Sequence, residues 1–139
     1  VIANMVELEG SVRSLDEDMR DLVQERLHQV AEGTAAANQC EITIEYERGY
    51  PITDNNEDAT HHAISVASLV SEVDTDTPPI MPSEDFSYML MEKPGAFIFL
   101  GNGDSQMLHN PEYIFDDEAI PFGSSWYAGM VEERLPITA

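Results

Sequence analysis

The chain has 139 residues, of which 42% are hydrophobic, so it is long enough for one ordinary domain or two small lobes. Its 27 Asp and Glu against 6 Lys and Arg give a formal net charge of −21, which argues against nucleic acid or an anionic membrane as a partner. Because the acids are spread along the chain, we interpret them as a solvated surface suited to a salty cytoplasm.

The cysteine content and the lack of long apolar runs exclude further classes of protein. Cys40 is the only cysteine, which excludes a disulfide framework and a Cys-rich metal site, and we expect it to be a half-buried structural thiol. No window approaches the roughly 18 apolar residues of a membrane-spanning helix, and no charged segment followed by an apolar core indicates a signal peptide. Because Val1 already lies inside a strand-like pattern, we expect the chain to be a piece of something longer.

Alternation and helical spacing predict strand, helix and strand in the first part of the chain. The segment "MVELEGSVRS" alternates, with apolar residues on one face and Arg13 on the polar face. Ser14 and Glu17 have the spacing of a capping box, so we expect an amphipathic helix over residues 15–37 with one buried stripe. The segment "EITIEYER" alternates again and predicts a second strand. These lengths are typical of one β-α-β unit in an α/β fold.

A second α/β lobe is expected after the turn-rich segment "GYPITDNNED". Helical spacing predicts helices over residues 57–70 and 116–135. A further helix is expected to start at Ser83 as N-cap, with Glu84 and Asp85 in its first turn. The apolar run "GAFIFLG" predicts a strand that is buried on both faces of a mixed or parallel sheet.

The histidines are the first residues to consider for chemistry. His61 and His62 are neighbours in an expected helix and point about 100° apart, so we interpret them as surface residues rather than as ligands of one metal. His109 lies on a loop that follows the predicted buried strand, and Pro111 restricts Asn110 to extended conformations. His109 is thus a candidate metal ligand, base or hydrogen-bonding turn residue. The chain has no H-E-x-x-H, C-x-x-C or G-x-S-x-G motif.

Five motifs, in this order, carry a family resemblance: "VELEGSVRS", "GYPIT", "PSEDFSYML", "PGAFIFLGNG" and "LHNPEYIFDDEAI". Over nearly the whole chain they resemble the C-terminal part of the M20 metallopeptidase family. The resemblance is to its amidohydrolase branch, which contains hippurate hydrolases, N-acyl-amino-acid amidohydrolases and the plant auxin-conjugate hydrolases. It implies a metal-dependent amidohydrolase that hydrolyses the amide bond of N-acyl amino acids.

The resemblance also implies a fold and a domain organisation. Residues 1–53 resemble the later half of a ferredoxin-like lid or dimerisation domain, with strand, helix and strand. Residues 54–139 resemble the C-terminal part of an α/β mixed-sheet, zinc-peptidase-like catalytic domain. We therefore expect an α/β protein that forms a homodimer through the lid.

Four residues receive expected roles from the resemblance. His109 matches the last metal-ligating histidine of a site that holds two divalent ions (Zn, Mn, Co or Ni). Arg13 matches a lid arginine that binds the substrate's carboxylate, and a guanidinium pairs bidentately with such a group. Ser83 and Glu84 belong to a turn expected beside the metals, where a helix N-terminus favours an anionic substrate group.

The residues of the catalytic step itself are not expected in this chain. In the family a glutamate base activates the attacking water, and the metals and a lid histidine stabilise the oxyanion. None of these has a match here, nor do the other metal ligands, so we expect no turnover by this chain alone. Ala3, Pro82 and a short "LVSEVDTD" link depart from the family's pattern. A second hypothesis is a small acidic α/β dimerisation or binding module without catalysis.

Overall fold

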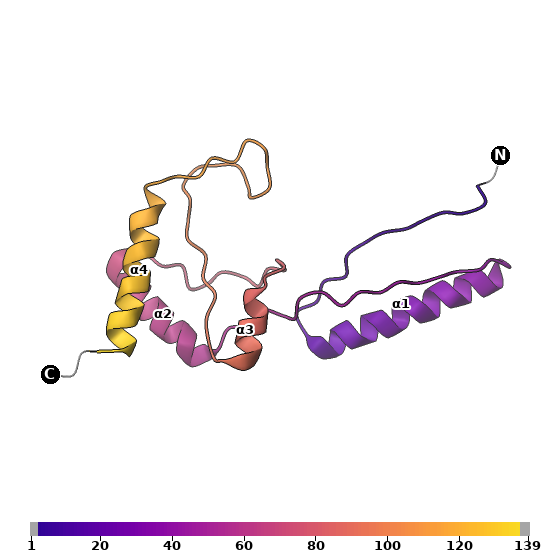
Figure 1. Cartoon of the computed structure of the whole chain (residues 1–139), viewed down its shortest axis with the longest axis horizontal. Coiled ribbons are helices and arrows are strands. Elements are labelled where there is room, and N and C mark those ends of the chain that lie inside the picture. The colour runs from indigo at the N-terminus through magenta and orange to yellow at the C-terminus, as the bar shows by residue number, and fades with distance from the viewer. Residues whose placement is uncertain (1–2, 137–139) are drawn as a thin grey trace. The chain divides into compact units, whose positions relative to one another are not determined.

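Helices joined by extended segments make up the chain in the computed structural model, which describes residues 3–136. This part of the chain contains four helices (Figure 1): α1 (Glu17–Ala37), α2 (Glu57–Val70), α3 (Phe86–Glu92) and α4 (Ala119–Arg134). The chain divides into two compact units. Unit 1 comprises the chain up to Ile52 together with Pro79–Ser87, and unit 2 comprises Thr53–Pro78 together with the chain from Tyr88 onward. None of the helices described is long and apolar enough to cross a membrane.

The expected α/β fold is wrong, because residues 3–136 contain no β-strand. The segments interpreted as strands, around residues 5–13, 41–48 and 95–101, are extended chain without a ladder of backbone hydrogen bonds in this part of the protein. Alternation predicts which side chains share a face. A strand also needs a neighbouring strand that bonds its N–H and C=O groups, and alternation carries no information about that neighbour. The predicted sheet of the lid and the predicted mixed sheet of the catalytic domain are therefore both wrong for residues 3–136.

The long first helix is confirmed, but its N-cap residue is Asp16 and not the predicted Ser14. Asp16 is the N-cap of α1, and its side chain accepts a hydrogen bond from the backbone N–H of Met19. Ser14 instead bonds within the preceding turn, where its Oγ lies 3.1 Å from the N of Asp16. Asp is as strong an N-cap as Ser, and here it stands one position before the first helical residue.

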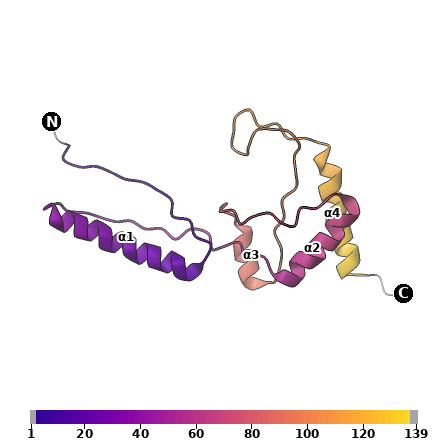
Figure 2. The ribbon, with the colours of Figure 1, turned by 180° about the vertical axis from the view of Figure 1, so that it is seen from behind.

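Within unit 1 the chain that follows α1 returns along this helix, as Figures 1 and 2 both show. The return is held by an ion pair of Arg48 with Asp21 and by a hydrogen bond of 2.8 Å from Arg20 Nη2 to the carbonyl oxygen of Gly49. The expected buried stripe of α1 is wrong, because no residue of this helix is buried. Cys40, which follows α1, is exposed rather than half-buried.

The exposed apolar residues of α1 are the ones that the helical spacing assigned to the core. Helical spacing identifies a face, and only a packing partner buries it. Met19 is 50% exposed and Val30 is 66% exposed, so within unit 1 this face is not covered.

Unit 2 is built on the packing of α2 against α4, which cross in both views of the ribbon (Figures 1 and 2). Both helices lie where their spacing predicted them. Ala63 and Val66 of α2 are buried, and Trp126 Nε1 of α4 donates a hydrogen bond of 3.1 Å to the carbonyl oxygen of Ala63. In the described structure the packing partner of α4 is α2.

The third helix begins later than its predicted N-cap. α3 starts at Phe86, so Ser83 lies before it and Glu84 and Asp85 are not in its first turn. The carbonyl oxygen of Glu84 accepts hydrogen bonds from the N–H of Ser87, at 3.2 Å, and from its Oγ, at 2.6 Å. The turn residues thus precede a helix of seven residues. The assignment of residues 1–53 to a lid and 54–139 to a catalytic domain stays a prediction.

Gly129 on α4 lies close to Val66 on α2 and leaves no room for a larger side chain. A Cβ at Gly129 would lie 2.7 Å from Val66 Cγ1, and Val66 is 3% exposed with a stiff, β-branched side chain. We expect Gly129→Ala to cost about 1–3 kcal/mol through overpacking. This exceeds the roughly 1 kcal/mol that Ala gains over Gly as a helix former. The free energy of unfolding, measured with urea and circular dichroism, should fall.

The matched control is Gly33 of α1, where an added Cβ would meet nothing within 4 Å. Gly33→Ala should raise the free energy of unfolding by about 0.5–1 kcal/mol, since only the helix propensity changes. Equal stabilisation by both substitutions would contradict the close contact of Gly129 with Val66.

Candidate functional site

His109 occupies a turn with unusual backbone geometry. Its φ is +68°, in the left-handed region that favours glycine. The turn is closed by the N–H of Asn110, which donates to the carbonyl oxygen of Met107 at 3.1 Å. A second turn follows, in which Asn110 Oδ1 accepts from the N–H of Glu112 at 2.9 Å. Since a β-turn with positive φ at its third residue selects Gly or Asn, a histidine here carries a conformational cost.

Side chains tie together the two arms of the loop that carries this turn. Asn102 Nδ2 donates to the carbonyl oxygen of Ile114 at 2.7 Å, and Asn102 Oδ1 accepts from the N–H of Asp116 at 2.8 Å. Ser105 Oγ lies 3.1 Å from both the N and the O of Ile114. Residues 102–105 and 114–116 are therefore clamped by an amide and a hydroxyl. We call these two side chains the loop clamp.

A similar contact fixes the segment that leads into the loop. Asn55, just before α2, donates from Nδ2 to the carbonyl oxygen of Phe97 at 2.9 Å and accepts from the N–H of Phe97 at 2.7 Å. The neighbouring N–H of Asn56 donates to the carbonyl oxygen of Gly95 at 3.0 Å. These bonds satisfy the carbonyl of Gly95 and both backbone groups of Phe97 in the apolar run that was expected to be a strand.

The described residues fit a divalent metal only in part. His109 is exposed and supplies one imidazole. No three His, Cys, Asp or Glu side chains within residues 3–136 lie together as a metal site would require. A zinc site takes three or four protein ligands, so this part of the chain does not make a metal site by itself. This part of the chain supplies a single candidate ligand, His109, in a hydrogen-bonded turn.

Arg13 and the turn before α3 lie in unit 1. Arg13 is exposed, and its Nη1 donates to the carbonyl oxygen of Met81 at 2.5 Å. Met81 precedes Ser83 by two residues, so the arginine contacts the segment that carries the other two predicted substrate-binding residues. Ser83 is exposed and Glu84 is half-buried. His109 belongs to unit 2.

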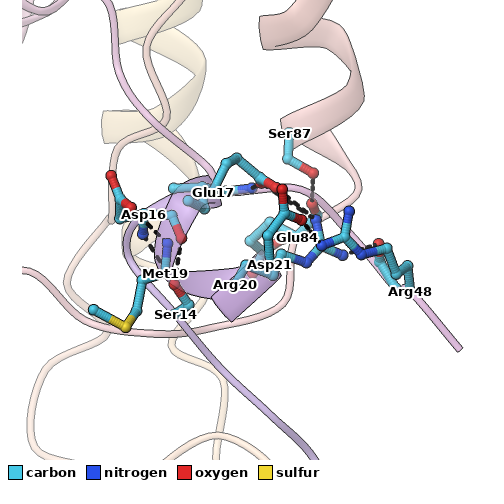
Figure 3. Close-up of polar contacts among 11 residues, drawn as sticks. Ser14, Asp16, Glu17, Met19, Arg20, Asp21, Arg48, Glu84 and Ser87 are labelled. Atoms are coloured by element: carbon cyan, nitrogen blue, oxygen red, sulfur yellow. Dashed lines mark hydrogen bonds and ion pairs between the residues drawn. The ribbon is translucent and has the colours of Figure 1, made fainter. Parts of the chain in front are cut away.

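Sequence reasoning missed the charged cluster at the start of α1, shown in Figure 3. Arg20 Nη1 lies 3.2 Å from Glu17 Oε1, and the same Oε1 accepts from the N–H of Ile52 at 3.4 Å. Arg48 pairs with Asp21, 27 positions away. The first pair has the three-residue spacing of helix neighbours and was detectable. The longer-range pair has no sequence signal, because it depends on how the chain returns along α1.

His62 also has a partner that the sequence did not indicate. Its Nδ1 lies 2.9 Å from Glu133 Oε1, so it links α2 to α4. The contact is an ion pair when the imidazole is protonated and a hydrogen bond when it is neutral. His61 is exposed. No group of three potential metal ligands includes either histidine in the described part of the chain, and their interpretation as surface residues stays a prediction.

One shallow hollow of about 380 Å³ lies in unit 2 and is separate from these residues. Its lining comes from Asp54–Asn56, before α2, and from Leu90–Gly95, at the end of α3. It contains none of the four predicted site residues, and two of its polar side chains are already engaged in the bonds of Asn55 and the N-cap of α2. We assign it no chemistry.

Comparison with known proteins identifies the family to which the chain belongs. The profile of Peptidase family M20/M25/M40 matches residues 4–133. The chain is 34% identical to a hippurate hydrolase of Campylobacter jejuni over 138 residues, which cover 97% of this chain and 36% of the relative. It is 33% identical, with the same coverage, to an N-acetyldiaminopimelate deacetylase of Pediococcus pentosaceus. No solved structure matches.

The matched relatives are named as a hydrolase and as deacetylases, and the matched profile is that of a peptidase family. The chain belongs to the M20 peptidase family, and the resemblance inferred from its motifs is confirmed. It spans 36% of the length of these relatives.

The backbone of His109 generates a prediction about stability. In the left-handed region a Cβ costs about 1–2 kcal/mol, so we expect His109→Gly to be more stable than His109→Ala by about 1 kcal/mol. Met107, two residues earlier, is the control, because its φ is not positive and its side chain is 81% exposed. There Gly should be less stable than Ala by about 0.5–1 kcal/mol. Urea unfolding of the four variants measures both differences, and the same sign at both positions would contradict the turn geometry.

Proposed function

We propose that this chain contributes to a metal-dependent amidohydrolase that hydrolyses the amide bond of N-acyl amino acids. The observation that carries the proposal is the match of residues 4–133 to the M20 family. The names of the relatives, hippurate hydrolase and N-acetyldiaminopimelate deacetylase, support an N-acylated substrate. The chain spans about a third of their length, so the proposed activity is that of the full-length gene product. We propose no turnover by residues 3–136 alone.

His109 is the proposed metal ligand of this chain. It would provide one imidazole to a site with two divalent ions (Zn, Mn, Co or Ni), with the remaining ligands coming from elsewhere in the enzyme. Its left-handed backbone supports the role, because strained conformations of this kind cluster at functional sites. A held ring also suits metal ligation, where the orientation of the imidazole matters.

Arg13 is the proposed binding residue for the substrate's carboxylate. Its guanidinium is exposed, and the described structure engages Nη1 with Met81. A guanidinium carries five N–H donors, so the remaining donors can pair with a carboxylate in the bidentate geometry. Ser83 and Glu84 complete the proposed substrate-binding set, supported by their place two and three residues after the carbonyl group that Arg13 contacts.

A homodimer formed through residues 1–53 is part of the same proposal. The uncovered apolar residues of α1, among them Met19 and Val30, support it. So does the family resemblance. The proposed location is the cytoplasm, which suits a single exposed free thiol in a reducing compartment. Sedimentation of the full-length gene product tests the dimer, and a monomer at all concentrations would overturn it.

The first test of the function is substitution of His109. In the full-length gene product loaded with Zn²⁺, Mn²⁺ or Co²⁺, we expect His109→Ala to lower kcat/KM for hippurate by more than about 100-fold, since loss of a group that only supports a ligand already costs 10–100-fold. The matched control is His61→Ala, an exposed histidine outside the site, which should retain wild-type activity. Full activity of His109→Ala would sink the metal-ligand role and favour a binding module without catalysis.

The second test separates substrate binding from chemistry. Arg13→Ala should raise KM for hippurate by about 10–100-fold with a partly retained kcat, because a hydrogen-bonded charge pair contributes about 1.5–3 kcal/mol to binding. Arg26→Ala is the control, since Arg26 also lies in unit 1 and its Nη1 donates a hydrogen bond of 2.9 Å to Gln29 Oε1, away from Met81. An unchanged KM in Arg13→Ala removes this residue from the site.

A further inference from the structure

The loop of His109 keeps its shape through side chains rather than through a sheet. Its two arms, residues 102–105 and 114–116, lie side by side in Figures 1 and 2, in the orange segment before α4. Within this loop only Asn102, Ser105 and Tyr113 are half-buried, and the other residues are exposed. A loop with so few buried groups gains little from apolar packing, so hydrogen bonds between its arms determine where its tip lies.

The side chain of Asn102 forms hydrogen bonds to the backbone of the opposite arm, as a neighbouring strand would do in a sheet. Its carboxamide has an acceptor oxygen and a donor NH2 group. The NH2 group donates to the C=O of Ile114, and the oxygen accepts from the N–H of Asp116, two residues further along the same arm. Ser105 bonds the N–H and C=O of Ile114 from a second point. Two attachment points on each arm fix both the separation of the arms and their register. One attachment point would leave the arms free to slide or rotate.

The arm that receives these bonds continues directly into α4. Asp116 Oδ1 accepts from the N–H of Glu118 at 2.9 Å, and the carbonyl oxygen of Asp116 accepts from the N–H of Ala119 at 3.0 Å. Ala119 is buried at 8% exposure. The loop clamp therefore connects the His109 turn to the packed part of unit 2.

We infer that Asn102 and Ser105 are positioning residues for His109, which hold its turn in one place while touching neither substrate nor metal. This inference rests on the proposed function, in which the position of the imidazole decides the rate. Misplacing a reacting or ligating group by about 1 Å costs on the order of 100-fold in rate. Binding of the substrate's carboxylate is proposed for Arg13, which belongs to unit 1 and not to this loop.

The test compares Asn102→Ala, Asn102→Asp, Ser105→Ala and Ser105→Thr in the full-length gene product. For Asn102→Ala we expect kcat for hippurate to fall about 10–100-fold, with KM changed less than about twofold. Asn102→Asp keeps the acceptor for Asp116 and loses the donor for Ile114, so its kcat should lie between those of Asn102→Ala and the wild type. Ser105→Thr retains the hydroxyl and should recover the kcat lost in Ser105→Ala.

The matched control is Asn38→Ala. It removes another exposed side chain to backbone hydrogen bond, from Asn38 Nδ2 to the carbonyl oxygen of Thr34 at 2.9 Å, in unit 1. Its kcat should equal that of the wild type. An unchanged kcat in Asn102→Ala, or a fall that Asn38→Ala reproduces, would overturn the inference.

A readout without turnover separates this inference from the proposed function. Histidine rings labelled with ¹³C give resonances, and that of His109 is assigned by its loss in His109→Ala. We expect Asn102→Ala to shift or broaden the His109 signal and to leave that of His61 unchanged. Absence of hydrolysis in the wild type would reject the proposed function alone. An unmoved His109 signal in Asn102→Ala would reject the positioning role, whatever the activity.

Discussion

Backbone N–H and C=O groups that leave a helix must find another partner, and in this chain asparagine side chains meet much of that need. Asn55 bonds both backbone groups of Phe97, and Asn102 bonds Ile114 and Asp116. A carboxamide carries a donor NH2 group beside an acceptor oxygen, so it can occupy the place of a peptide unit on a neighbouring strand. The path of unit 2 between its helices depends on these contacts.

Hydrogen bonds from side chains to the backbone also hold the segments that carry the candidate site residues. His109 is exposed, and the two arms of the loop that carries its turn are joined by the hydrogen bonds of the loop clamp. In unit 1, Arg13 is tied to the turn that precedes α3 by its bond to Met81. Each unit thus holds one of the two side chains proposed for chemistry, a metal-ligating imidazole and a carboxylate-binding guanidinium. Both proposed roles rest on the resemblance to the M20 family, to which the chain belongs.

The sequence predicted the helices better than the rest of the fold. α1, α2 and α4 lie within three residues of their expected bounds at each end, because their spacing, their caps and their Gly and Pro neighbours act locally. The three expected strands failed for one reason, since alternation predicts a face and not a bonded neighbour. Cys40 and the apolar face of α1 failed similarly, because burial is a property of the partner surface. The cap of α1 was missed by a choice between two good N-cap residues.

By itself the sequence determined the family, the acidic charge and the candidate residues Arg13 and His109. Motifs depend only on the local order of residues, and net charge depends only on composition, so neither requires the tertiary structure. Only the tertiary structure decided that Gly129 lies against Val66, that Arg48 reaches Asp21, and that Asn102 closes the loop of His109. These contacts join residues 12 to 63 positions apart. No local pattern specifies such pairs, since each depends on the path that the chain takes between them.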